Sequence, residues 1–109
     1  MVNIVVLMTT MSKHEAQKIA QNLLEKRLIA CANIFGPVES HFWWQSKIER
    51  AEEFLVLMKS NSRLFSKLTK AVNEMHSYDV PEILAVPIIE GFALYLKWMN
   101  SVLLHFGES

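Results

Sequence analysis

The chain has 109 residues, 51% of them apolar, and its 11 basic side chains balance 11 acidic ones. This length fits a single domain over residues 1–109 with one hydrophobic core, and the apolar fraction excludes a disordered chain. A chain without a basic stripe offers no electrostatic attraction to nucleic acid or an anionic membrane, and no apolar run is long enough to span a bilayer. One cysteine, six methionines and the absence of a signal-peptide pattern favour a reducing, cytoplasmic location.

The residue pattern of the first part of the chain predicts a strand followed by a helix. Residues 3–9 form a short run rich in Ile and Val, which is typical of a buried strand. Ser12 precedes Glu15 by three residues, the spacing of a capping box in which Glu15 reaches back to the amide of Ser12. The helix that follows places five apolar side chains on one face: Ala16, Ile19, Ala20, Leu23 and Leu24.

Residues 31–59 predict a long β-hairpin around a polar turn at residues 45–47, with a bulge or an edge at Gly36-Pro37. Each arm has about 13 residues and would span roughly 40 Å at ~3.3 Å per residue, which exceeds the length of any helix predicted here. The hairpin would therefore overhang its own core. Because an isolated two-stranded ribbon is only marginally stable in water, we expect a neighbouring copy of the chain to cover it.

The residue pattern of the second half of the chain predicts a helix, a strand and a last helix. Ser60-Asn61-Ser62 can cap the first of these helices, whose apolar stripe is Leu64, Leu68, Ala71, Val72 and Met75. Pro81 ends a loop, and residues 83–89 predict a strand with Pro87 near an end or on an edge. After Gly91, a last helix carries the stripe Phe92, Tyr95, Leu96, Met99, Val102, Leu103 and Phe106, with Leu94, Trp98 and Leu104 off it. One face of this helix is therefore expected to meet something other than its own sheet.

The order of elements is strand, helix, strand, strand, helix, strand, followed by one more helix. This order is typical of the split-βαβ arrangement, in which two helices cover one face of an antiparallel sheet. The sequence thus predicts an α+β protein, a ferredoxin-like βαββαβ sandwich with a long β-hairpin and an extra C-terminal helix.

Few residues could carry chemistry. Cys31 can be a small buried hydrophobe, or it can act as a soft metal ligand or a reactive thiol. His76 can be a histidine that is stabilised by the dipole at a helix C-terminus, or it can act as a metal ligand or a proton carrier. Met8 has a thioether that suits Cu(I), although filling the core is its default role. A nucleophile paired with a base is not visible, so we do not expect an enzyme.

Several motifs resemble one known family. The segments ACANIFGPVESHFWWQSKIE, HSYDVPEILAVPI and YLKWMNSV, together with LMTT and LEKRLIA, occur in the family's order. The sequence is similar over essentially its whole length to the CutA (CutA1) divalent-cation tolerance family. This resemblance implies a homotrimer in which long hairpins extend the sheets across subunits, an architecture like that of PII signalling proteins, and roles in metal-ion tolerance and copper binding.

The resemblance also implies a set of site residues. The family's metal-binding Cys and His fall on Cys31 and His76, and Met8 stands where some members carry a second Cys. The residues implied to line a ligand cleft are Trp44, Lys59, Tyr78, Glu82 and Trp98. The sequence departs from the family pattern at Met8, at the Gln45-Ser46 turn and at Ser77.

Two functions remain open. The first is a trimer without an obligatory cofactor that binds copper, zinc or a small ligand in clefts between subunits, with Cys31 and His76 close together and Met8 or Glu82 completing a metal site. The second is a structural or interaction trimer that presents its surface to a protein partner and has no metal function.

Overall fold

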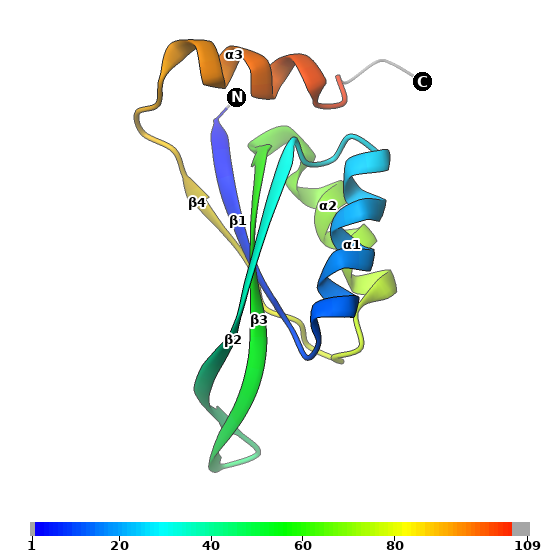
Figure 1. Cartoon of the computed structure of the whole chain (residues 1–109), viewed down its shortest axis with the longest axis vertical. Coiled ribbons are helices and arrows are strands. Elements are labelled where there is room, and N and C mark those ends of the chain that lie inside the picture. The colour runs from blue at the N-terminus through cyan, green and yellow to red at the C-terminus, as the bar shows by residue number, and fades with distance from the viewer. Residues whose placement is uncertain (1, 106–109) are drawn as a thin grey trace.

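The computed structural model describes residues 2–105, which form a four-stranded antiparallel sheet and three α-helices (Figure 1). The elements in chain order are β1 (Asn3–Thr10), α1 (Lys13–Glu25), β2 (Cys31–Trp44), β3 (Lys47–Asn61), a 3-10 turn (Ser62–Leu64), α2 (Phe65–Met75), β4 (Ile83–Pro87) and α3 (Ala93–Val102). The strands lie in the order β2-β3-β1-β4, and α1 and α2 cover one face of the sheet. The fold is therefore a ferredoxin-like βαββαβ sandwich with a long hairpin and an extra C-terminal helix.

The core lies between this face of the sheet and the two helices. Alternate residues of β1 and β3 point into it, and Val6, Met8, Val56 and Met58 are fully buried. They meet the expected stripes of the helices, which bury Ala16, Ile19, Ala20 and Leu23 on α1 and Leu68, Ala71 and Val72 on α2. Leu24 was expected in this core but is 37% exposed, because it lies about 100° around the helix from Leu23.

The predicted N-cap of α1 is confirmed with one change of partner, whereas the cap expected for the second helix lies on a 3-10 turn before α2. Ser12 is the N-cap of α1, and its Oγ accepts from the amide of Glu15 at 3.1 Å. The Glu15 carboxylate accepts from the amide of Met11, at 3.4 Å, rather than from that of Ser12 as expected. Asn61 caps the 3-10 turn before α2, with its side-chain oxygen 3.1 Å from the amide of Arg63.

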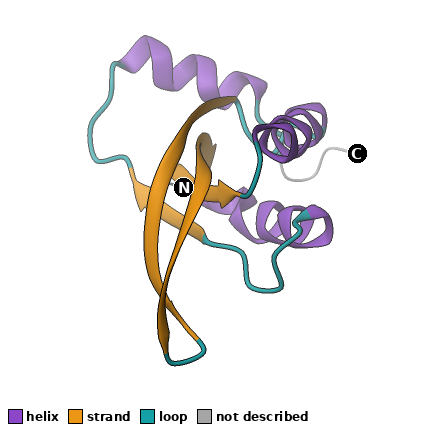
Figure 2. Ribbon diagram, turned by 60° about the horizontal axis from the view of Figure 1, so that its bottom comes forward, coloured by secondary structure: helices purple, strands orange, loops and turns teal. Residues whose placement is uncertain are grey.

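The hairpin overhangs the rest of the sheet, as predicted. β1 pairs with β3 only over residues 54–61, whereas the pairs between β2 and β3 continue to Trp44 and Lys47. The far part is therefore a two-stranded ribbon, and it projects away from the helices in both views (Figure 1, Figure 2). Gln45 and Ser46 form its turn with φ of 50° and 65°, the left-handed conformation that both central residues of a tight type I′ turn adopt.

The second face of the sheet carries apolar side chains that α1 and α2 do not cover. Val5 pairs with Val86, and Leu7 pairs with Leu84, so these four side chains lie on one face. Leu84, Val86 and Phe35 are exposed, and the neighbouring residues Val5, Leu7, Leu55 and Leu57 are only partly buried. This uncovered face, called the outer face below, needs a partner to bury it.

α3 lies near one end of the sheet, beyond β1 and β3 (Figure 1). It buries Met99 fully, and Leu103 just after the helix is 2% exposed. The sequence pattern placed Phe92 and Tyr95 on the same buried stripe, but they are 73% and 42% exposed. Only the C-terminal part of the helix is buried against the rest of the chain, and its first turn is not. Phe106 lies outside the described residues. No helix among residues 2–105 combines the length and apolar character needed to cross a membrane.

A bulge interrupts the pairing of β2 between Phe35 and Val38, at the predicted Gly36-Pro37 position on an edge strand. Gly36 has φ of 152°, which side chains rarely adopt. A Cβ added there would lie 2.9 Å from the carbonyl oxygen of Glu53. The bulge, which marks the start of the overhanging ribbon, therefore requires glycine.

We predict that Gly36→Ala lowers the free energy of unfolding by about 1–3 kcal/mol through backbone strain and this close contact. Gly91→Ala is the matched control, because a Cβ at Gly91 meets only the flexible side chain of Leu96. Urea denaturation of both variants tests the prediction. Equal losses in the two variants would contradict it.

Candidate functional site

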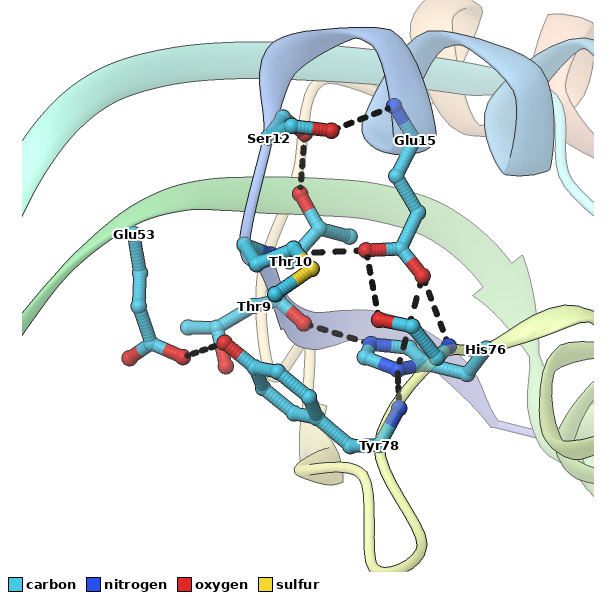
Figure 3. A network of polar contacts seen from close by, with 9 residues as sticks. Thr9, Thr10, Ser12, Glu15, Glu53, His76 and Tyr78 are labelled. Carbon is cyan, nitrogen blue, oxygen red and sulfur yellow. Dashed lines mark hydrogen bonds and ion pairs between the residues drawn. The ribbon is translucent and has the colours of Figure 1, made fainter.

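A buried polar network joins the end of β1, the start of α1 and the loop after α2 (Figure 3). At its centre is His76, whose side chain is fully buried. Its Nε2 lies 2.7 Å from the carbonyl oxygen of Thr9, and its Nδ1 lies 3.0 Å from the amide nitrogen of Tyr78. Since an amide only donates and a carbonyl only accepts, Nδ1 carries no proton and Nε2 carries one. Both ring nitrogens of the neutral imidazole are thus already used.

Glu15 ties the loop to α1. Its carboxylate accepts from the amide and the hydroxyl of Ser77, at 2.7 and 3.1 Å, in addition to the Met11 amide, and lies 3.8 Å from Nδ1 of His76. Burial alone would raise the pKa of Glu15, but the hydrogen bonds from the amide and hydroxyl of Ser77 and from the Met11 amide lower it below its ordinary value of 4.5. The carboxylate therefore holds residues 76–77 against the helix in its charged form.

Tyr78 connects the same loop to the ribbon. Its ring packs at a tilt against His76, with centroids 4.8 Å apart, and its hydroxyl donates to Glu53 at 2.7 Å. Burial raises the pKa of Tyr78, and the hydrogen bond to Glu53 and the negative charges of Glu53 and Glu15 raise it further. The phenol therefore stays protonated and anchors Glu53, which is buried at the base of the ribbon.

A second polar cluster lies on the outer face, near α3. Ala32 and Ile34 pack against the core, so the alternate residues Cys31 and Asn33 point the opposite way. The Nζ of Lys59, the residue paired with Cys31, lies 3.7 Å from the Cys31 sulfur and also contacts Oδ1 of Asn33. Cys31 is a free, partly exposed thiol. This cluster places a soft donor where an external ligand can reach it.

Two aromatic residues of α3 flank the second cluster. Tyr95 and Trp98 pack at a tilt with ring centroids 5.4 Å apart. Burial raises the pKa of Tyr95, and the negative charge of Cys31 together with the hydrogen bond from the phenol to its sulfur raises it further. α3 therefore brings a protonated phenol to the thiol on the outer face.

One chain does not bring the three expected metal ligands together. Cys31 is level with Val5 across the sheet, whereas His76 contacts Thr9, four residues further along β1. Four strand residues correspond to about 13 Å. Met8 is fully buried on the helix-covered face. Among residues 2–105, no group of three or more His, Cys, Asp and Glu side chains is placed to hold a metal ion.

The five expected cleft residues also separate into three places. Lys59 and Trp98 belong to the cluster beside α3, Tyr78 belongs to the His76 network, with Glu82 exposed just before β4, and Trp44 lies at the tip of the hairpin. A cleft lined by all five would have to draw them from more than one chain.

Sequence reasoning did not assign Ser77, Glu53 or Asn33 to a site, and gave Glu15 only a capping role. Asn33 could have been found, because a side chain two residues from Cys31 shares its face of a strand. Glu53 carried no such signal, since a glutamate beside Glu52 on a hairpin is typical of a solvated edge. Its partner Tyr78 lies 25 residues away, and only the folded chain brings them together.

Comparison with known proteins places the chain in a family. Residues 4–102 match the family described as CutA1 divalent ion tolerance protein. The chain is 45% identical over 95 residues to the divalent-cation tolerance protein CutA of Archaeoglobus fulgidus, covering 87% of this chain and 92% of that one. It is 36% identical over 99 residues to a rice protein named Protein CutA 1, chloroplastic, of which it spans 56%.

Solved structures agree with these sequence matches. The structure named as the periplasmic divalent cation tolerance protein CutA of Archaeoglobus fulgidus has a TM-score of 0.89, with 43% identity and coverage of 92% of this chain and 97% of that one. The Cut A1 structure from Thermus thermophilus has a TM-score of 0.91 at 40% identity, with 93% and 98% covered. These folds define a class of small ferredoxin-like proteins with a projecting hairpin. The chain belongs to the CutA1 divalent ion tolerance family.

The lowered pKa of Glu15 predicts a pH-dependent contribution to stability. A depressed carboxyl pKa stabilises the fold above the unfolded value of about 4.5, and this contribution is lost as the pH falls through the folded value. We therefore expect Glu15→Gln to cost about 1–3 kcal/mol at pH 7, as for hydrogen bonds to charged groups, and progressively less in acid.

Glu25→Gln, at the exposed far end of α1, is the matched control and should change stability little at either pH. Urea denaturation at pH 7 and below pH 4 measures both variants. A deficit of Glu15→Gln that stays constant across this range would contradict the role assigned to the charge.

Proposed function

We propose that this chain is a non-enzymatic divalent-cation tolerance protein that works as a homotrimer and binds copper or zinc, or a small ligand, in clefts between its subunits. Membership of the CutA1 family supports the tolerance role, since this is the role in the family's description. The observation that carries the proposal is the reachable thiol of Cys31 on the uncovered outer face. The PII-like architecture and a cytoplasmic location are part of the proposal, and relatives named chloroplastic or periplasmic show that location varies within the family.

The uncovered apolar surface supports assembly. The outer face and the ribbon both expose side chains that water solvates poorly, including Phe42, Trp43, Trp44 and Ile48 at the ribbon. Both edge strands, β2 and β4, carry unpaired backbone groups that a neighbouring copy can use. A closed ring of three chains buries this surface and leaves no open edge for further growth.

The contacts of His76 limit which residues can serve as ligands in the proposed metal site. A metal on either ring nitrogen would have to replace the bond to Thr9 or to Tyr78 inside a fully buried side chain. Cys31 needs no such rearrangement, and its thiolate suits Cu or Zn rather than Mg or Ca. We therefore place the soft donor at Cys31 and assign His76 a structural role, with the remaining ligands coming from a neighbouring subunit or water.

The ligand cleft is proposed to join residues from different subunits. Trp44 lies on the ribbon, beyond the residues of β3 that pair with β1, while Lys59 and Trp98 lie on the outer face that a neighbour would cover. Tyr78 and Glu82 lie at the other end of the sheet. A hairpin tip from one chain placed against the outer face of the next would complete such a cleft.

A second candidate function is a structural or interaction trimer that presents its surface to a protein partner. The hydrogen bonds of His76 favour this candidate. Both of its ring nitrogens serve structural hydrogen bonds, so this histidine has a role in the fold that requires no metal. The two functions differ in whether Cys31 is required.

Native mass spectrometry of the protein titrated with Cu, Zn and Mg tests both assembly and metal binding. We expect a trimer that gains Cu or Zn and not Mg, and we expect Cys31→Ser to lose this gain at least tenfold in affinity. His76→Gln should retain the metal while being less stable. If Cys31→Ser retains the metal and His76→Gln loses it, the assignment of Cys31 as the soft donor is refuted. If the wild type and both variants bind no metal, the interaction trimer is favoured.

Trp44→Ala is expected to weaken the trimer, because truncating a buried aromatic anchor at an interface commonly costs about 2 kcal/mol or more. Met11→Ala is the comparison, since Met11 is also an exposed apolar side chain, at 58%, but lies between β1 and α1 and not on the ribbon. Dilution followed by light scattering measures both dissociation constants. A Trp44→Ala trimer that dissociates like the wild type would argue against burial of this side chain in the assembly.

A further inference from the structure

Cys31 and Lys59 form a directly opposed pair across β2 and β3. Opposed residues in an antiparallel pair have Cβ atoms only about 4.5–5.5 Å apart, so their side chains are held together by the backbone. The Lys59 Nζ donates to the Cys31 sulfur at 3.7 Å. The pair therefore places a primary amine beside a thiol before any reaction takes place.

Asn33 fixes the position of this amine. Its Oδ1 accepts from Lys59 Nζ and also from the Cys31 thiol, at 3.9 Å in the latter case. Within residues 2–105, Lys59 Nζ contacts this oxygen and the Cys31 sulfur, and it forms no ion pair with a carboxylate. The lysine is thus held against the thiol instead of being drawn to an acidic group.

The surroundings of the pair allow a small oxidant to reach it. Cys31 and Lys59 are only partly buried, and the sulfur lies on the outer face beside Tyr95. Peroxide is small enough to enter a site of this exposure, and a thiolate that it oxidises forms a sulfenic acid. A sulfenic acid can condense with a backbone nitrogen to a sulfenamide. The Lys59 amine nitrogen, 3.7 Å from the Cys31 sulfur, is placed for the same reaction.

We propose that peroxide oxidation of Cys31 joins its sulfur covalently to the Lys59 nitrogen. In the first step the Cys31 thiolate attacks hydrogen peroxide, the O–O bond breaks, and the sulfur, oxidised by two electrons, becomes a sulfenic acid while hydroxide leaves. In the second step the Lys59 ammonium gives up a proton to solvent, its nitrogen attacks this sulfur, the S–O bond breaks, and the hydroxyl leaves as water with a second proton from the nitrogen. The S–N bond that forms requires no further oxidant.

This crosslink would bind β2 to β3 at the end of the sheet nearest α3. It removes both the thiolate and the ammonium from the outer face, so the oxidised chain loses a soft donor and a positive charge together. Thiols reverse sulfenamides, and the crosslink is therefore a reversible modification that protects Cys31 from the irreversible sulfinic and sulfonic acids. The two groups that it joins belong to one chain and need no metal, whereas the access of peroxide to them depends on how much of the outer face the proposed trimer leaves open.

Intact-mass analysis of the purified protein after exposure to hydrogen peroxide tests the proposal. We expect a mass series offset by about −2 Da, for the two hydrogens lost, from the series that methionine oxidation alone produces, where a simple sulfenic acid would add about 16 Da. Tryptic digestion without reductant should give one peptide joined through Cys31 and Lys59 and uncleaved after Lys59. Dithiothreitol should restore the original mass and the cleavage.

Lys59→Arg is the matched variant, because it keeps a positive charge and removes the reactive amine. We expect its Cys31 peptide, read separately from the six methionines that peroxide also oxidises, to gain about 16, 32 and 48 Da in place of forming the crosslink. Lys47→Arg, at the far end of β3, should behave like the wild type. The proposal is overturned if wild type and Lys59→Arg give the same oxides, or if the wild type instead forms a disulfide between two chains. Peptide mapping of the wild type decides the question even if a variant folds poorly.

Discussion

The difference in length between the strands of the hairpin and the helices that cover them shapes this molecule. β2 and β3 have 14 and 15 residues and run along the longest dimension of the molecule, which is 43 Å, whereas the 13 residues of α1 reach only about 20 Å. Two helices of this size can bury one face of one end of the sheet. The ribbon and the outer face then remain apolar and uncovered, and the proposed assembly is the direct response to this constraint.

The two polar clusters have different roles because they differ in which polar groups remain available to bind or react. In the His76 network each ring nitrogen has a partner, and Glu15 and Tyr78 fasten the loop to α1 and to the base of the ribbon. Such a network rigidifies the fold. In the cluster on the outer face, a thiol and an amine meet at a partly exposed position, and these are the groups that can react or bind.

Local patterns predicted the element order, the N-cap of α1, the bulge and the overhang, because each of these depends on neighbours in the sequence. The cluster at Cys31 was only partly predictable: the resemblance pointed to Cys31 and Lys59, but cross-strand register places them together. The bonds of His76 could not be predicted, since Thr9 lies 67 residues away and its carbonyl leaves no trace in the sequence. For the same reason the sequence could not show that Cys31 and His76 lie far apart in one chain.

Amide hydrogen exchange along the ribbon tests most directly whether a second chain covers it. A two-stranded ribbon that is bare on both faces opens readily, so its amides would exchange nearly as fast as those of an unstructured peptide. If a neighbouring chain covers the ribbon, residues 38–53 will be protected nearly as strongly as β1 at micromolar concentration and will lose this protection on dilution. Rapid exchange of the ribbon beside a fully protected β1, at every concentration, would contradict the proposed assembly.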